Sequence, residues 1–135
     1  MSKIISEILL DTHAFIWLAE DDPKLPSSTR DRIEATDRVF VSIISFWEIA
    51  IKLKKAKIFL ICDFNDIQDK FESTGFKLLP ITIEDTIQLH NLPLYDENHK
   101  DPFDRLLIAQ AIRKSLPLVS RDSFFDAYPI QRIWG

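Results

Sequence analysis

The sequence has very little glycine: Gly75 and Gly135 are the only two among 135 residues. A nucleotide-binding P-loop needs several glycines so that backbone N–H groups can surround a phosphate, and a dinucleotide-binding fingerprint needs three within six positions. Neither motif can be formed from this chain. The shortage therefore excludes P-loop NTPases and Rossmann-type dehydrogenases.

The chain also has little cysteine and only a small excess of one charge sign. Cys62 is the only cysteine, so the chain can form neither an internal disulfide nor a Cys-based zinc site. The 17 Lys and Arg residues face 21 Asp and Glu residues, which gives a formal net charge of −4. A protein with this balance does not attract nucleic acid or anionic lipid as a whole. A polyanionic partner would need a local basic patch or a bound metal ion.

Long hydrophobic runs are missing as well. The longest, over residues 39–51, is interrupted by Ser42, Ser45 and Glu48, which makes it too short and too polar to span a bilayer. The N-terminal stretch is broken by Glu7 and does not have the pattern of a signal peptide. We therefore expect a cytoplasmic protein with no membrane segment.

The residues that are present predict one α/β domain over residues 1–135. Apolar residues make up 46% of the chain, which is enough for a core, and the length is typical of a single domain. Short β-like runs alternate with longer helical patterns, which predicts a mainly parallel sheet with helices on both faces. The expected strands are 4–10, 38–41, 76–80, 116–120 and 129–134, and the expected helices are 14–20, 27–35, 45–57, 63–73, 82–91 and 101–114.

Two aspartates directly follow expected strands. Asp11 comes after the first strand, and Asp122 comes after strand 116–120 with one residue between. Ligands of open parallel sheets bind at the carboxyl ends of the strands, where both residues would lie. Aspartate is also common in turns after strands, and for either residue alone this ordinary explanation is the better one.

Two further acids lie on expected helices. Glu48 shares a polar stripe with Ser45 and Lys52, which a capping box and an i,i+4 ion pair explain without any function. Asp104 is harder to explain in this way, because its helix is otherwise almost continuously apolar and Asp101 can already cap it. A buried carboxylate needs a cation, backbone donors or a metal as its partner.

Four carboxylates that meet at one sheet edge would repel each other unless a divalent cation neutralised them. Oxygen ligands of this kind suit Mg²⁺ or Mn²⁺. A zinc site does not compete, because His13, His90 and His99 lack the spacing of zinc ligands.

The segments around these acids resemble the PIN-domain nucleases, in particular the VapC toxins of bacterial type II toxin–antitoxin modules. The segments are LLDTHAFIWL with Asp11, SIISFWEIAIK with Glu48, HKDPFDRLLIAQA with Asp104 and LVSRDSFF with Asp122. They occur in the family's order and extend over nearly the whole chain. The resemblance implies a PIN-like three-layer α/β/α sandwich with a central, mainly parallel sheet.

The resemblance also implies roles for individual residues. The expected catalytic and metal-binding residues, which would hold Mg²⁺ or Mn²⁺, are Asp11, Glu48, Asp104 and Asp122. Small or acidic neighbours would orient the acids or a bound water, and these are Thr12, Asp101 and Ser120. Because the net charge is negative, RNA would need basic contacts near the site. The candidates are Lys52, Lys55 and Arg121.

The activity that the resemblance implies is that of a metal-dependent endoribonuclease toxin, which cleaves RNA phosphodiester bonds. Its expected partners are an RNA substrate, a cognate VapB-type antitoxin and a second copy of the chain in a homodimer. We expect residues 58–100, which carry no motif, to set specificity. The alternative is a non-catalytic metal- or RNA-binding PIN-like module. A phosphatase with Asp11 as nucleophile is disfavoured, because such enzymes need a second Asp where His13 stands.

Overall fold

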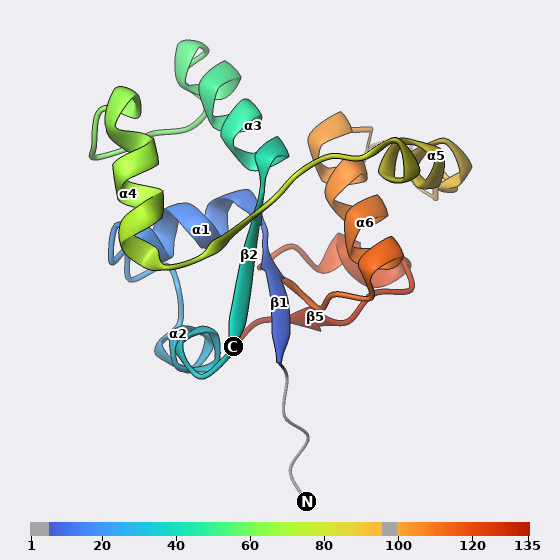
Figure 1. Cartoon of the computed structure of the whole chain (residues 1–135), viewed down its shortest axis with the longest axis horizontal. Helices are drawn as coiled ribbons and strands as arrows, with labels where there is room; N and C mark the ends of the chain where they lie inside the picture. The colour runs from blue at the N-terminus through green and yellow to red at the C-terminus, as the bar shows by residue number, and fades with distance from the viewer. Residues whose placement is uncertain (1–5, 96–99) are drawn as a thin grey trace, which may run out of the picture.

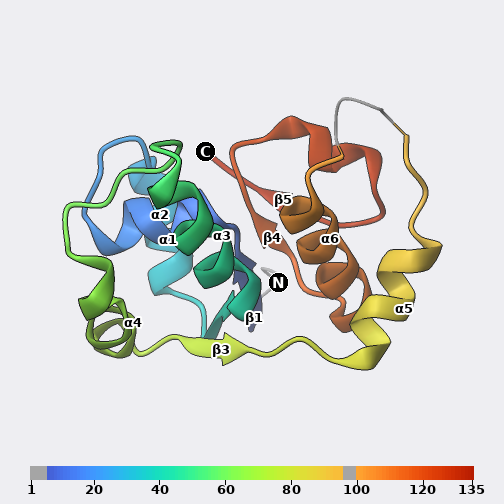
Figure 2. The ribbon, with the colours of Figure 1, turned by 90° about the horizontal axis from the view of Figure 1, so that it is seen from above.

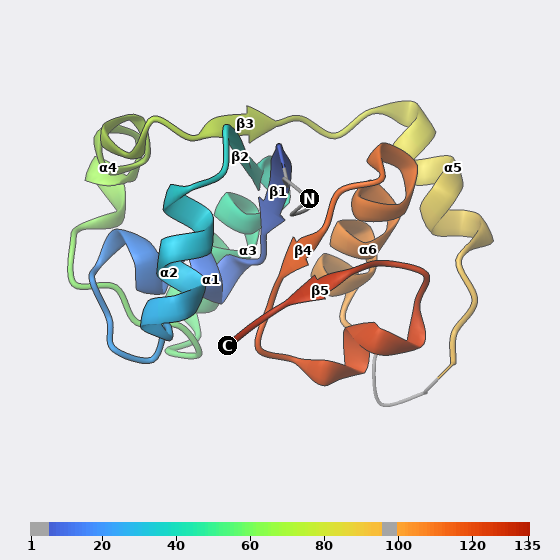
Figure 3. The same ribbon diagram turned by 90° about the horizontal axis from the view of Figure 1, so that it is seen from below.

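A computed structural model of the chain describes residues 6–95 and 100–135. In this part of the chain, five short parallel strands form one sheet with the order β3-β2-β1-β4-β5. Figure 3 shows β3 and β5 at opposite edges of the sheet. The strands are β1 (Glu7–Leu10), β2 (Arg38–Ser42), β3 (Lys77–Leu79), β4 (Leu118–Val119) and β5 (Arg132–Ile133).

Helices cover both sides of this sheet, as the alternation of strands and helices predicts (Figures 1 and 2). On one side lie α1 (Thr12–Ala19), α2 (Ser27–Glu34), α3 (Ile43–Lys54) and α4 (Ile67–Thr74), and on the other lie α5 (Ile83–Asn91) and α6 (Pro102–Lys114). Two short 3₁₀ helices, η1 (Phe64–Asp66) and η2 (Ser123–Ala127), complete the described elements. The predicted α/β/α sandwich is confirmed. None of the described helices is long and apolar enough to cross a membrane.

The core lies in two layers, one on each face of the sheet. Successive side chains of a strand point to opposite faces, so Ile8 and Leu10 of β1 join one cluster while Leu9 joins the other. Helix α6 contributes Leu107 and Ile108 to the second cluster, where both are fully buried. Strands buried on both faces consist of continuous apolar runs, as residues 8–10 of β1 do.

Residues with known capping preferences begin and end several helices. Thr82 and Asp85 form a reciprocal capping box at α5, and Asp101 accepts hydrogen bonds at the N-terminus of α6. Gly75 ends α4 with φ of 73°, a left-handed conformation that glycine adopts without steric cost. Local sequence therefore fixes these ends.

Other boundaries differ from the prediction. Helix α3 begins at Ile43 rather than at Ser45, because the Ser42 hydroxyl accepts a hydrogen bond from the N–H of Ile44 at 3.1 Å and caps the helix. The predicted capping box of Ser45 and Glu48 is therefore wrong. Four of the expected strands are longer than the observed ones, whereas β2 extends one residue further than expected, to Ser42. Residues 4–5 of the first expected strand lie outside the described residues, as do residues 96–99 between the expected helices 82–91 and 101–114.

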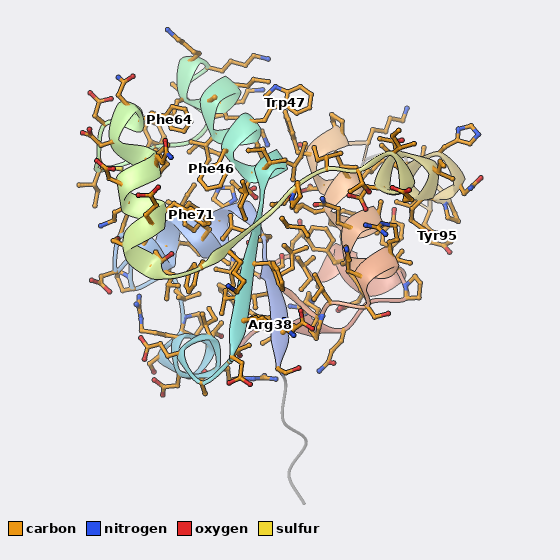
Figure 4. The ribbon with its side chains drawn as sticks, viewed as in Figure 1. Arg38, Phe46, Trp47, Phe64, Phe71 and Tyr95 are labelled. Atoms are coloured by element: carbon orange, nitrogen blue, oxygen red, sulfur yellow. The ribbon has the colours of Figure 1, made fainter. Side chains whose placement is uncertain are left out.

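Aromatic side chains join α1, α3 and α4. Phe46 and Phe71 point toward each other from α3 and α4 (Figure 4), with ring centroids 5.3 Å apart in an edge-to-face arrangement. Phe15 of α1 lies 5.5 Å from Phe46 and 6.1 Å from Phe71. Such pairs add stability beyond the area that they bury, so the position of α3 over the sheet is well determined on this side.

Candidate active site

The strand order creates a switch point between β1 and β4. From β1 the chain runs outward through β2 to β3, and it then returns to the other side of β1 to form β4 and β5. In open parallel sheets, the connections on either side of such a point diverge and leave a crevice at the carboxyl ends of the strands. Asp11 follows β1 and Asp122 follows β4, so the topology brings these two distant residues to the same crevice.

Asp11 and Asp122 are held by local hydrogen bonds. Asp11 is the N-cap of α1, and its carboxylate accepts the N–H of Ala14 at 2.8 Å. Asp122 caps η2 by accepting the N–H of Phe124 at 3.0 Å. Buried Ser120 connects the two acids, because its hydroxyl bonds to the Asp11 carboxylate and accepts the N–H of Asp122 at 3.0 Å. The predicted ordinary capping chemistry is thus present at both residues.

Glu48 enters the crevice from the second turn of α3. Its side chain is buried, and Oε1 accepts a hydrogen bond from the Thr12 hydroxyl at 2.6 Å. Ser45 Oγ lies 2.9 Å from Thr12 Oγ1, so a serine on the same face of α3 supports the threonine. The polar stripe identified from the sequence therefore points inward against the first turn of α1.

Lys52 contacts two carboxylates. Its ammonium group pairs with Glu48 Oε2, one helical turn earlier, and lies 3.3 Å from Asp101 Oδ2 at the start of α6. The predicted i,i+4 ion pair is confirmed. Burial works against the charge of Lys52, but its bonds to Glu48 and Asp101 outweigh burial and raise its pKa, which keeps the ammonium charged.

Asp104 completes the acidic group from the first turn of α6. Asp101 Oδ1 already accepts the N–H groups of Phe103 at 2.8 Å and of Asp104 at 3.1 Å, so the helix end is capped without the Asp104 carboxylate. No ion pair joins the Asp104 carboxylate to any described residue. Among the four acids, Asp104 is therefore the one whose carboxylate has neither an ion pair nor a hydrogen bond within residues 6–95 and 100–135.

The four acids line one hollow of about 530 Å³. Its wall also includes one histidine and two basic side chains, which are His13, Lys52 and Arg121. The remaining lining residues are Thr12, Trp17, Ser123 and Phe125. The structure thus brings together all four predicted acids, although they come from α1, α3, α6 and the turn before η2.

Burial and mutual repulsion perturb two of these acids. Burial raises the pKa of Asp11 to about 6 against the hydrogen bonds from Ser120 and Ala14, and the charge of Glu48 adds to the rise. Burial also raises the pKa of Asp104 to about 7, and the charges of Asp101 and Glu48 add to it. Carboxylates with such values lack compensating positive charge, which is the condition that a bound cation relieves.

The donor set fits a hard divalent cation. The acids offer only oxygen atoms, which Mg²⁺ and Mn²⁺ prefer, and the charge of Asp11 is among the causes that raise the pKa of Asp104. As placed, no three His, Cys, Asp or Glu side chains within residues 6–95 and 100–135 are near enough together to hold a metal ion. Glu48 contributes to this separation, because both of its oxygens are engaged by Thr12 and Lys52.

The other predicted site residues have distinct positions. Arg121 lies on the wall of the hollow with its guanidinium carbon 4.9 Å from the centre of the Trp17 ring. Lys55 is exposed just beyond the end of α3 and does not line the hollow. Arg105, which follows Asp104 directly, pairs with no carboxylate of the described residues. It donates instead to the carbonyl groups of Leu92 at 2.8 Å and Pro93 at 3.2 Å.

Four residues of the wall were not predicted as site residues, namely His13, Trp17, Ser123 and Phe125. His13 and Trp17 lie on the first turns of α1, and their rings are 5.4 Å apart. Burial lowers the pKa of His13, so the neutral imidazole is favoured. The spacing of four residues between His13 and Trp17, just after Asp11, was a usable signal, because residues i and i+4 of a helix share a face.

Comparisons with known proteins bear on this arrangement. A family model described as PIN domain matches residues 8–131, which agrees with the family predicted from the four acidic segments. Ribonuclease VapC22 of Mycobacterium tuberculosis is 25% identical over 118 residues, which cover 87% of this chain and 88% of the relative.

Solved structures share the fold at low sequence identity. One is a chain of VapBC2 from Rickettsia felis bound to a DNA fragment from their promoter, with a TM-score of 0.67 and 15% identity over 96% of this chain and 99% of that one. Another belongs to a toxin–antitoxin complex from Klebsiella pneumoniae, with a TM-score of 0.58 and 16% identity over 93% and 95% of the two chains. At these identities the likeness supports the fold.

Proposed function

Because the chain belongs to the PIN domain family, we propose that it acts as a single-domain, metal-dependent endoribonuclease that cleaves RNA phosphodiester bonds. The observation that carries the proposal is the hollow at the switch point, which four carboxylates from separate elements line. The relative from Mycobacterium tuberculosis is named a ribonuclease, which supports the same chemistry.

In this proposal, Asp11 and Asp104 are the main ligands of Mg²⁺ or Mn²⁺, and Asp122 and Glu48 complete the site or orient the attacking water. When bound, such an ion polarises a phosphoryl oxygen, lowers the pKa of water and offsets the negative charge of the transition state. Ser120 and the N–H of Ala14 hold the Asp11 carboxylate in place.

Arg121 is the proposed contact for the RNA backbone inside the hollow. Its guanidinium group is exposed, lies over the Trp17 ring and forms no ion pair with a described residue, so it is free to bind a phosphate. Lys55, which is exposed at the end of α3, extends the basic surface outside the hollow. These two cations offset locally a chain that is negative overall.

The proposal includes protein partners. One of the similar structures is a toxin–antitoxin complex, and we propose that this chain is likewise a cytoplasmic toxin that a VapB-type antitoxin neutralises. An acidic hollow favours a basic side chain of such a partner. Exposed apolar residues, among them Trp47 at 56% and Ile83 at 76%, provide surface for an antitoxin or for a homodimer.

One observation favours the alternative of a non-catalytic binding module. Glu48 is paired with Lys52 rather than free to join the other acids. Turnover distinguishes the two functions, because a binding module would hold RNA or metal without cutting RNA.

The test is cleavage of a mixed pool of structured RNA by purified protein in Mg²⁺, in Mn²⁺ and in EDTA. Asp104→Asn, prepared in parallel, reveals contaminating nuclease. We expect metal-dependent cleavage by the wild type and none by the variant, with the variant still folded by circular dichroism. Equal cleavage by both proteins would contradict the assignment of the site. Binding of RNA by both without cleavage would support the alternative.

A further inference from the structure

The pairing of Lys52 with two carboxylates indicates a role other than RNA binding. Its side chain is only 22% exposed, and the Glu48 and Asp101 side chains that it contacts are 4% and 33% exposed. A cation held by two carboxylates in a partly buried place is poorly available to a phosphate, because that contact would require breaking one of these ion pairs.

Lys52 also connects two helices that come from distant parts of the sequence. It lies on α3, and Asp101 caps α6 at 49 residues' separation. The Nζ atom is 5.6 Å from the centre of the Phe103 ring in the first turn of α6. Next to this contact, Trp47 projects from α3 (Figure 4) and meets Phe103 edge-to-face at 5.3 Å. Lys52 is therefore part of the contact that sets how α3 and α6 lie together.

The position of Glu48 depends on this contact. Thr12 holds Oε1 and Lys52 holds Oε2, so the rotation of the carboxylate is fixed from both sides. The other oxygen of Asp101 accepts the N–H of Asp104. The same lysine thus bonds directly to one acid of the hollow and to the residue that caps the helix carrying another.

We propose that Lys52 is a positioning residue of the nuclease site, which fixes the Glu48 carboxylate and ties it through Asp101 to the start of α6. It does so as a permanent counter-charge within the acidic hollow. The inference rests on the proposed nuclease function for its consequence in catalysis, but the contact itself can be measured without RNA or metal.

A double-mutant cycle of thermal unfolding in EDTA measures the contact. Lys52→Met leaves the buried Glu48 carboxylate without its cation, and we expect its melting temperature to fall by roughly 5–10 °C. Glu48→Gln keeps an oxygen for the Thr12 hydroxyl and needs no cation. The double variant Lys52→Met/Glu48→Gln should therefore regain most of the loss. Lys114→Met, at the exposed far end of α6, is the matched control for the removal of one positive charge.

Steady-state cleavage of an RNA oligonucleotide in saturating Mn²⁺ then separates positioning from binding. We expect Lys52→Met to lower kcat by tenfold or more with KM within about threefold, and Lys52→Arg to restore part of kcat because it keeps the charge and the donors. Additive effects in the cycle would overturn the proposal. A raised KM with unchanged kcat would also overturn it and would make Lys52 an RNA contact. A wild type that cleaves no RNA would instead contradict the nuclease function and leave the cycle as an independent result.

Discussion

Replacement of Asp104 by Asn should make the metal-free protein more stable while it abolishes cleavage. Burial, with the charges of Asp101 and Glu48, raises the pKa of Asp104 from 3.8 to about 7. The folded state therefore disfavours the charged carboxylate, whereas the unfolded chain does not. Removing the ionisable group removes this cost.

The size of the effect follows from the pKa difference. Each pH unit between the folded and unfolded pKa is worth about 1.4 kcal/mol, so a difference of about three units gives an upper limit of roughly 4 kcal/mol. The Asp104 side chain is only partly buried, and solvent screening reduces the figure to about 2 kcal/mol. For a chain of this length, that corresponds to a rise in melting temperature of roughly 6–10 °C.

The sign of the pH dependence is also determined. Between about pH 4 and pH 7 the folded protein binds more protons at Asp104 than the unfolded chain does, so the contribution of Asp104 to stability falls as the pH rises through this window. Above pH 7 the full cost remains, and below pH 4 it vanishes. Burial lowers the pKa of His13, which gives a slope of opposite sign. The contribution of His13 is present in both the variant and the wild type, so it cancels when the two proteins are compared.

Urea unfolding in EDTA at several pH values between 4 and 8 measures both quantities. Asp104→Asn should exceed the wild type by about 2 kcal/mol at pH 8 and match it near pH 4. Asp31→Asn, an exposed residue of α2, controls for the loss of a carboxylate elsewhere and should change stability by less than about 0.5 kcal/mol. A variant that is no more stable than the wild type at pH 8 would refute the argument, as would a difference independent of pH.

Three other predictions concern RNA binding, a buried ion pair and a helix end. Arg121→Gln in an Asp104→Asn background should weaken RNA binding and reduce the slope of the logarithm of the binding constant against the logarithm of salt concentration by about one. Fluorescence anisotropy measures this slope, and an unchanged slope would exclude a phosphate contact. Asp85 is 1% exposed, and although burial opposes its ionisation, the hydrogen bonds from Arg113 and others lower its pKa. Asp85→Asn should therefore lower the free energy of unfolding in urea by about 2–3 kcal/mol at pH 7. The difference from the wild type should shrink only as the pH falls below about 4, and a destabilisation that is the same at pH 3 would contradict this. Gly75→Ala should cost about 1 kcal/mol because φ is 73° there, while an unchanged melting temperature would contradict the strain.

Sequence alone determined the parts of the fold that depend on short-range chemistry. The capping box of Thr82 and Asp85, the cap at Asp101 and the left-handed Gly75 all lie where their residue types predict. These features need only neighbours within a few positions, so no knowledge of the rest of the chain is required. The parallel sheet followed from the alternation of strands and helices for a similar reason, since parallel strands need crossover connections.

The position of Asp11 and Asp122 was also predictable, because both follow strands whose carboxyl ends must lie at one edge. That they share a single hollow depends on the strand order, which places β4 beside β1. Local sequence does not encode this order, because it results from which apolar faces cover one another.

Only the tertiary structure decided the roles of α3. Its periodicity placed Ser45, Glu48 and Lys52 on one polar stripe, and a capping box with an i,i+4 ion pair explained them without any function. The fold instead turns that face toward Thr12 and Asp101, where Glu48 becomes buried and Lys52 bridges two helices. The same four-residue spacing suits an exposed ion pair and a buried one. The partner that a charged side chain finds is fixed by residues 36 and 49 positions away, and only packing brings those residues into reach.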